Sequence, residues 1–273
     1  MRYSAVKPKK FLGQHFLTDL SIASAIADTV DACPGLPILE VGPGMGVMTQ
    51  FLVRKSRELK VVEIDDESVR YLRRTYPDME DSIIEDDFLK MHLERTFGGS
   101  PFVLTGNYPY NISSQIFFRV LDYKDLIPCC TGMVQKEVAE RMAAAPGSKT
   151  YGILSVLLQA WYDVEYLFTV EPNVFNPPPK VRSAVVRLTR NGTTSLGCDE
   201  KLFRQLVKTT FNQRRKMLRN NIQPLLQSLS TPDNKSPFKG DLEGLPFMTR
   251  RPEQLSVQDF VTLTLRLQEE IEK

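Results

Sequence analysis

Short apolar runs alternate with segments of helical periodicity over the first 150 residues of the chain. Stretches such as 47–55 and 68–75 are long enough for crossover helices. The apolar runs lie at 37–41, 60–64, 82–86, 102–105 and 132–135. Strands that alternate with helices in this way form parallel sheets. The pattern therefore predicts an α/β fold with a doubly wound, mostly parallel sheet, as in Rossmann-like proteins.

The pattern is less regular between this region and Arg190. Segments 153–170 and 183–189 are expected to be further strands or a helix followed by a strand, and the second is apolar and β-branched. Between them, the prolines of 176–179 exclude a helix or a central strand.

After Arg190 the composition changes, and the polar stretch NGTTSLG is typical of a connection. Helices are expected at 201–211 and 214–229. A further helix is expected near Ser256, which has capping-box spacing with Asp259. We therefore predict an α/β domain over residues 1–190 and a small helical domain over residues 191–273.

Composition excludes several classes of protein. No apolar run approaches the ~18 residues that span a bilayer, and the basic N-terminus lacks the apolar core of a secretory signal. The four cysteines show no CxxC spacing, which indicates reduced thiols in a cytoplasmic protein. The only two histidines, His15 and His92, argue against a zinc site and a Ser–His–Asp hydrolase. We expect no metal site and no membrane association.

The net charge of +2 hides an asymmetry along the chain. Residues 58–94 are rich in acids, whereas residues 201–219 carry seven cations and no acid. Such a run is often a solvated surface, but the missing acids favour contacts with phosphates. If 214–229 is one helix, Arg215 and Arg219 share a face of it. The candidate RNA-binding residues are Lys208, Arg214, Arg215, Lys216 and Arg219.

The sequence LEVGPGMG directly follows the first expected strand. Its Gly42, Gly44 and Gly46 give G-x-G-x-G in place of the dinucleotide pattern G-x-G-x-x-G. Glycines allow the backbone to approach a ligand closely, and Pro43 removes one N–H that could bind phosphate. The loop therefore favours a ligand without phosphates. NAD stays the rival cofactor, and a purely structural turn stays possible.

Acidic residues at the ends of the next two strands sharpen this hypothesis. Glu63 ends the second strand in VVEID, where a carboxylate can accept hydrogen bonds from ribose hydroxyls. Asp87 ends the third in IIEDDF, beside Phe88, and can accept a bond from an adenine amino group. A ribose, an adenine and no phosphate together describe S-adenosylmethionine.

The fourth strand ends in GNYPYNIS. The side-chain oxygen of Asn107 and a backbone carbonyl beside Pro109 could accept the two N–H bonds of an adenine N6 amine, and Tyr110 offers a stacking face. The amine would then point at the methyl group, provided that the base is unstacked. The proline run could present Phe175 as a second stacking face. The alternatives are a plain turn for NYPY and core packing for Phe175.

The chain resembles the bacterial ribosomal small-subunit adenine dimethyltransferases. The resemblance covers residues 9–221 through KKFLGQHFL, EVGPGMGVMT, VVEID, GNYPYNIS, MVQKEVAERM, FNPPPKVRSAVVRL and FNQRRKMLRNN. It implies transfer of methyl groups from S-adenosylmethionine to N6 of two adjacent adenines, near the 3′ end of 16S rRNA in the immature small ribosomal subunit. It also implies a role in ribosome biogenesis.

The resemblance also implies roles for individual residues. The cofactor would contact His15, Leu17, Gly42, Gly44, Glu63, Asp87 and Asn107, and the target adenine would contact Asn107, Pro109, Tyr110 and Phe175. Two positions depart from the family pattern. His15 replaces the usual Asn, and Tyr108 replaces the usual Leu or Ile, where it could narrow the pocket mouth or pack against the sheet.

Two other functions stay open from the sequence. One is a macrolide-resistance methylase that acts on 23S rRNA and shares the NxPY motif. The GPG loop and FNQRRK favour the small-subunit enzyme. The other is an RNA-binding or assembly factor that has lost catalysis, against which the intact Glu63, Asp87, Asn107 and Tyr110 argue. We expect a monomer.

Overall fold

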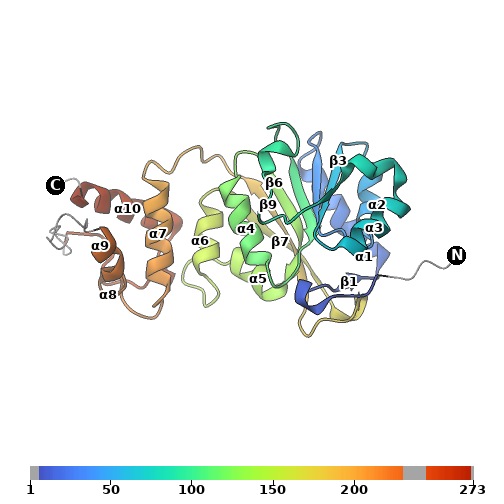
Figure 1. The fold of residues 1–273 in the computed structure, drawn as a ribbon. Helices are drawn as coiled ribbons and strands as arrows, with labels where there is room; N and C mark the ends of the chain where they lie inside the picture. Colours follow the sequence, from blue (N-terminus) through green and yellow to red (C-terminus); the bar gives the residue numbers. More distant parts are fainter. Residues whose placement is uncertain (1–5, 230–243, 272–273) are drawn as a thin grey trace. The chain divides into compact units, whose positions relative to one another are not determined.

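A computed structural model describes residues 6–229 and 244–271, and the chain divides into two compact units (Figure 1). The first unit comprises Met1–Glu140 and Asp163–Arg190, and the second comprises Arg141–Tyr162 and Asn191–Lys273. The predicted division at residue 190 is therefore incomplete, because residues 141–162 belong to the second unit.

The reason lies in α6 (Ile153–Gln159), which the sequence left between a strand and a helix. Leu154, Val156 and Leu157 are all buried, and α6 packs against α7 (Glu200–Phe211) and α10 (Val257–Ile271). A helix that is apolar around its circumference needs partners on several sides. These partners are supplied by helices that follow much later in the sequence.

A seven-stranded sheet forms the first unit, in the order β4-β3-β2-β5-β6-β9-β7. Its strands are β2 (Ile38–Val41), β3 (Leu59–Glu63), β4 (Ile83–Glu85), β5 (Val103–Asn107), β6 (Cys129–Gln135), β7 (Tyr162–Val170) and β9 (Ser183–Arg190). The strands from β4 to β6 are parallel, and β9 is antiparallel to β6. The doubly wound, mostly parallel sheet is confirmed. The strand order reverses between β2 and β5, where ligands bind in such sheets.

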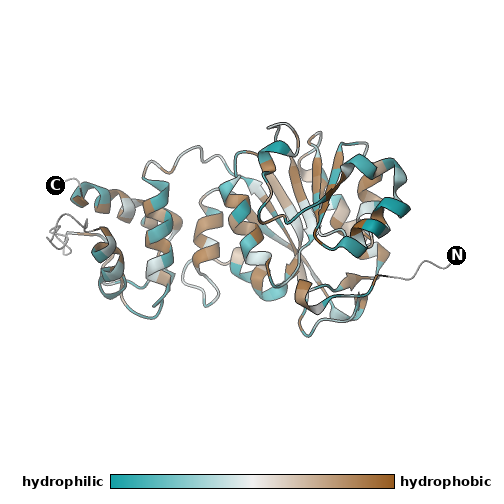
Figure 2. Ribbon diagram, in the orientation of Figure 1, coloured by the Kyte–Doolittle hydropathy of each residue, from teal (hydrophilic) through white to brown (hydrophobic). Residues whose placement is uncertain are grey.

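Helices alternate with these strands and cover the sheet. They are α1 (Leu20–Asp28), α2 (Thr49–Leu52), α3 (Asp66–Thr75), α4 (Ser113–Asp122) and α5 (Lys136–Met142). Leu52 of α2 and Leu72 of α3 pack on Ile38, Val61 and Val103 of the sheet, all of them buried. Figure 2 shows the resulting pattern of apolar strands and helices with mixed polarity. This packing fixes the strand ends that carry the candidate site.

The N-terminal segment lies against the proline-rich segment that precedes β9. β1 (Phe16–Leu17) pairs antiparallel with β8 (Phe175–Asn176), with Leu17 opposite Phe175. Both side chains are buried. Residues 9–17, called the N-terminal strap below, are thereby held next to the carboxyl ends of the central strands.

In the second unit, the prediction of one continuous helix over residues 214–229 is wrong. Residues 212–217 form turns, followed by α8 (Leu218–Asn221) and α9 (Gln223–Leu229). The buried Asn221 Nδ2 donates to the carbonyl oxygens of Thr210, Gln213 and Lys216 at 3.1, 3.1 and 3.0 Å. These bonds satisfy carbonyls at the end of α7 and hold the turns, so residues 215 and 219 do not share a helix face.

The last helix of the second unit begins as expected. The backbone N–H of Ser256 donates to Asp259 Oδ2 at 3.0 Å, and that of Asp259 donates to Ser256 Oγ at 3.1 Å. This capping box starts α10. In the part of the chain that the structure describes, no helix is both long and apolar enough to cross a bilayer.

Candidate active site

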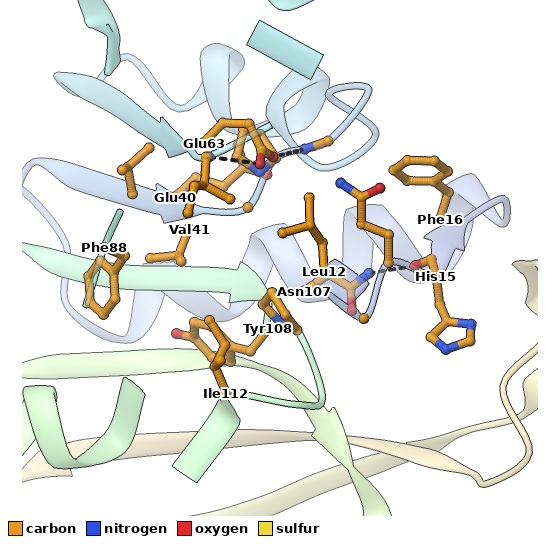
Figure 3. A pocket seen from close by; sticks show the side chains of 18 of the residues that line it. Leu12, His15, Phe16, Glu40, Val41, Glu63, Phe88, Asn107, Tyr108 and Ile112 are labelled. Carbon is orange, nitrogen blue, oxygen red and sulfur yellow. Dashed lines mark hydrogen bonds between the residues drawn. The ribbon is translucent and has the colours of Figure 1, made fainter. Parts of the chain in front are cut away.

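A cavity of about 210 Å³ opens at the carboxyl ends of β2, β3 and β5, and the N-terminal strap forms one of its walls (Figure 3). Its lining contains every residue proposed to bind the cofactor, namely His15, Leu17, Gly42, Gly44, Glu63, Asp87 and Asn107. Pro109 and Tyr110 line the same cavity. Residues far apart in the sequence therefore meet because parallel strands end at one edge of a sheet.

The glycine loop after β2 is held tightly between its neighbours. Gly44 has φ +55°, and a Cβ there would lie 2.9 Å from Phe16 Cε1 in the strap. Gly46 has φ +76°, and a Cβ there would lie 2.6 Å from Tyr76 Cε2. Larger residues fit neither the space nor the left-handed backbone. The loop is thus fixed in one shape beside the carboxylate of Glu63.

Glu63 is 5% exposed and is oriented by three backbone N–H groups. Oε1 accepts bonds from Ile64 and Asp65 at 2.9 and 3.0 Å, and Oε2 accepts one from Gly44 at 3.0 Å. Burial raises the pKa of Glu63, and the three N–H bonds oppose that rise. Because a carboxylate oxygen can accept two hydrogen bonds, Oε2 retains capacity for a ligand hydroxyl.

Glu40 also lines the cavity, and the sequence analysis missed it. It is 1% exposed on β2, and its Oε2 accepts a bond from Thr49 Oγ1 at 2.6 Å. Burial raises its pKa to about 8, and the neighbouring Glu63 adds to the rise. Glu40 therefore holds its proton at neutral pH. The sequence did contain a signal for a special role of Glu40, because it is an acid inside an apolar strand just before the glycine loop.

The third strand end supplies a carboxylate and apolar surface. Asp87 Oδ1 accepts a bond from the Leu89 N–H at 2.9 Å, and Lys90 Nζ lies 3.1 Å from Oδ2. Its neighbour Phe88 is buried in the cavity wall. Ile64, which the sequence analysis also missed, lines the cavity although it is 55% exposed. An exposed apolar side chain beside an anchored carboxylate suits a flat ligand with an amino group.

Asn107 ends β5 with its carboxamide oriented by the strap. Its Nδ2 donates to the backbone oxygen of His15 at 3.1 Å (Figure 3). Among the described residues, nothing donates to its Oδ1, which remains able to accept an N–H bond from a ligand. This geometry matches the acceptor role expected for the amide oxygen.

The residues after Asn107 are held by β6 and β9. The hydroxyl oxygens of Tyr110 and Ser183 lie 2.5 Å apart, which fixes the Tyr110 ring to the start of β9. Tyr108 is fully buried and donates its hydroxyl proton to Thr131 O at 2.9 Å. Of the two possibilities for Tyr108, packing against the sheet is the one observed.

Phe175 lies in the core beside the candidate site. It is 4% exposed, does not line the cavity and packs with Leu17, Met48 and Val185 in the core. Its pairing with Leu17 across β1 and β8 turns the ring inward. In this structure Phe175 therefore packs in the core, and its contact with the target adenine stays a prediction.

The anchor of the strap was not predicted either. Lys9 forms an ion pair with the buried Asp65 and lies 3.5 Å from Asp66, at the start of α3. Gln14 accepts a bond from the Lys9 N–H at 2.9 Å and donates from Nε2 to Asp65 at 3.4 Å. These contacts close the cavity wall on the side of Glu63.

In the second unit, the predicted RNA-binding residues differ in their surroundings. Arg214 donates from Nε and Nη2 to Glu253 at 2.9 and 2.6 Å and from Nη2 to Lys149 O at 2.9 Å. Arg214 therefore forms a structural ion pair with Glu253, and its contact with phosphates stays a prediction. Exposed positions are occupied by Lys208, Arg215, Lys216 and Arg219.

Comparisons with known proteins show the family of the chain. The family model for "Ribosomal RNA adenine dimethylase" matches residues 5–236. A protein from Phocaeicola vulgatus called "Ribosomal RNA small subunit methyltransferase A" is 71% identical, over 95% of this chain and 89% of its own length. A protein of the same name from Porphyromonas gingivalis is 57% identical, over 97% of this chain and 99% of its own length.

Solved structures support the same conclusion. A dimethyladenosine transferase from Plasmodium falciparum has a TM-score of 0.77 and 26% identity, over 94% of this chain and 98% of that chain. The 23S rRNA methyltransferase ErmE has a TM-score of 0.62 and 24% identity, over 93% of this chain and 99% of that chain, which supports the fold alone. The chain thus belongs to the ribosomal RNA adenine dimethylase family, and it is an S-adenosylmethionine-dependent adenine dimethyltransferase that acts on rRNA.

Proposed function

We propose that this enzyme dimethylates N6 of two adjacent adenines in a loop near the 3′ end of 16S rRNA, within the immature small ribosomal subunit. The observation that carries the chemistry is the Asn107 carboxamide, whose nitrogen is held by His15 while its oxygen is left to a ligand. The choice of small subunit rests on the names of relatives that are up to 71% identical.

The residues around the cavity fit the cofactor. The Glu63 carboxylate would hold the ribose, Asp87 would hold the adenine amino group, and Ile64 and Phe88 would cover the base. The backbone of Gly42 and of the strap would line the remainder. When bound, the cofactor supplies a methyl group on a sulfonium sulfur.

The chain's own task is to make a poor nucleophile reactive. The N6 lone pair of adenine is delocalised into the ring, which keeps the amine planar. Asn107 Oδ1 and a backbone carbonyl oxygen beside Pro109 would each accept a hydrogen bond from one N6–H group. Two such bonds favour a pyramidal nitrogen with its lone pair directed at the methyl carbon. The rate then comes largely from positioning.

No general base is required in this scheme, because N6 becomes strongly acidic once it carries a positive charge. The cationic nitrogen then loses one proton directly to water, which leaves the neutral methylated amine. Tyr110, fixed through Ser183, would support the face of the extruded base.

The basic residues Lys208, Arg215, Lys216 and Arg219 are proposed to contact rRNA phosphates. We further propose that the enzyme is a monomer and works in the cytoplasm, where small subunits are assembled.

The test is incubation of the enzyme and labelled cofactor with small subunits that lack these methyl groups, followed by mass mapping of the modified nucleosides. Dimethyladenosine at two adjacent positions near the 3′ end of 16S rRNA is expected, and already methylated subunits serve as the control. Methylation of 23S rRNA instead would replace the proposal with the macrolide-resistance alternative. Label in neither RNA would refute both.

A further inference from the structure

Residues 9 and 14 of the N-terminal strap converge on one buried carboxylate, that of Asp65. Lys9 Nζ forms an ion pair with Asp65 Oδ1, and the Asp65 side chain is only 1% exposed. Gln14 Nε2 donates to Asp65 Oδ2 at 3.4 Å, and Gln14 Oε1 accepts a bond from the Lys9 N–H at 2.9 Å. Residues 9–14 thus form a closed loop whose first and last side chains are both fastened to Asp65, just before α3.

Asp65 also belongs to the wall that orients the candidate ribose carboxylate. Its backbone N–H donates to Glu63 Oε1 at 3.0 Å, and its side chain accepts a bond from Ser68 Oγ at 2.9 Å. Gln14 and Glu63 line the same cavity. The loop that Lys9 fastens therefore closes the cavity on the side where the cofactor ribose is proposed to bind.

We propose that Lys9 is a positioning residue for the cofactor, and that its ion pair with Asp65 is a latch that opens when the cofactor enters or leaves. The inference rests on the ribose-binding role proposed for Glu63. While the latch is closed, residues 12–14 form part of the cavity lining. The far end of the strap stays paired through β1 and β8, so opening moves residues 9–14 and leaves Leu17 in place.

The surroundings of Lys9 suit a latch that holds but can be released. Asp66 and Glu67 lie 3.5 and 3.7 Å from its Nζ, so three carboxylates attract one cation. The Lys9 side chain is nevertheless 25% exposed, so water and salt ions reach its ammonium group. Salt weakens an ion pair that is open to solvent on one side. Release of the cofactor should therefore become faster as the ionic strength rises.

The test measures dissociation of S-adenosylmethionine by surface plasmon resonance for wild type, Lys9→Ala, Asp65→Asn and the double variant. Each single variant should raise the dissociation rate about fivefold or more, because a charge-assisted bond is lost. The double variant should add little to either single one, because both substitutions remove the same pair. Between about 0.05 and about 0.5 M salt, the wild-type rate should rise more steeply than that of Lys9→Ala.

A second measurement needs no cofactor. In hydrogen exchange of the cofactor-free protein, the backbone amides of residues 9–14 should exchange faster in Lys9→Ala than in wild type, whereas those of α1 should be unchanged. If Glu63 does not bind the ribose, Glu63→Ala will leave cofactor affinity unchanged. That failure of the proposed function would not alter the exchange result, so the two ideas are tested separately.

Lys55→Ala is the matched control. The Lys55 side chain is 17% exposed and pairs with Asp28 and Asp31 at 2.5 and 2.7 Å, and none of the three is among the described residues that line the cavity. Equal dissociation rates in wild type and Lys9→Ala would overturn the proposal. An equal rise in Lys55→Ala would also overturn it, because the effect would then be a general loss of stability. Additive effects in the double variant would show that Lys9 and Asp65 act separately, which refutes the latch.

Discussion

Replacement of Glu40 by Gln should change how the stability of the first unit depends on pH. The pKa of Glu40 rises from its ordinary 4.5 to about 8 because the carboxyl is buried on β2. Between these values the folded protein holds a proton that the unfolded chain has lost. Raising the pH in that window therefore favours unfolding. Glutamine keeps the shape and an oxygen that can accept the bond from Thr49, but it cannot ionise.

The magnitude follows from the size of the shift. Each pH unit inside the window is worth about 1.4 kcal/mol, so wild type should lose roughly 3 kcal/mol relative to Glu40→Gln between about pH 5 and about pH 7.5. Below the ordinary pKa the wild-type Glu40 carboxyl is protonated in both the folded and the unfolded state, so the stability curves of the two proteins should run parallel. Glu63, whose pKa is also raised, is present in both proteins, so its own titration contributes to both stability curves.

The assay is urea unfolding of both proteins at several pH values, followed by far-UV circular dichroism. The single tryptophan, Trp161, belongs to the second unit, so its fluorescence would report on the wrong part of the chain. A difference in unfolding free energy that grows with pH supports the account. A difference that stays constant over the whole range would show that Glu40 does not retain its proton, and the reasoning from burial would be refuted.

Three further predictions concern the ligands and the second unit. Glu63→Ala should weaken cofactor binding at least about tenfold through lost charge-assisted bonds, with RNA affinity within about twofold, and calorimetry with each ligand separately checks this. Neutralising Arg215 and Lys216 should flatten the slope of log affinity against log salt by about 1.5, and an unchanged slope removes them from the RNA interface. Asn221→Ala should destabilise the second unit by about 1–3 kcal/mol, because three carbonyls lose their donor, whereas the exposed Asn220→Ala should have little effect in the same thermal melts.

The parallel sheet and most of the cavity lining could be predicted from the sequence for a physical reason. Apolar runs such as 37–41 and 60–64 coincide within one residue with β2 and β3, because a buried strand leaves an uninterrupted apolar signal. Residues that end parallel strands must meet at one edge, so Glu63 and Asn107 could be placed in one cavity without coordinates.

The features that the sequence analysis did not foresee share a different cause, since each depends on a contact between distant segments. The burial of Phe175 follows from its pairing with Leu17, and the ion pair of Arg214 follows from the position of Glu253. The turns at 212–217 depend on hydrogen bonds from the side chain of Asn221. The periodicity of apolar residues carries no information about such bonds. Local patterns specify elements, but partners that are distant in the sequence decide what each side chain contacts.

The central claim is that the Asn107 carboxamide positions the adenine amine for methyl transfer. The most direct test is single-turnover methylation of unmethylated small subunits by Asn107→Ala, at saturating cofactor and RNA, with separate measurement of both affinities. The account predicts that dimethyladenosine formation falls at least about a hundredfold, through loss of positioning, while RNA affinity stays close to that of wild type. Near-normal turnover by Asn107→Ala would contradict the account.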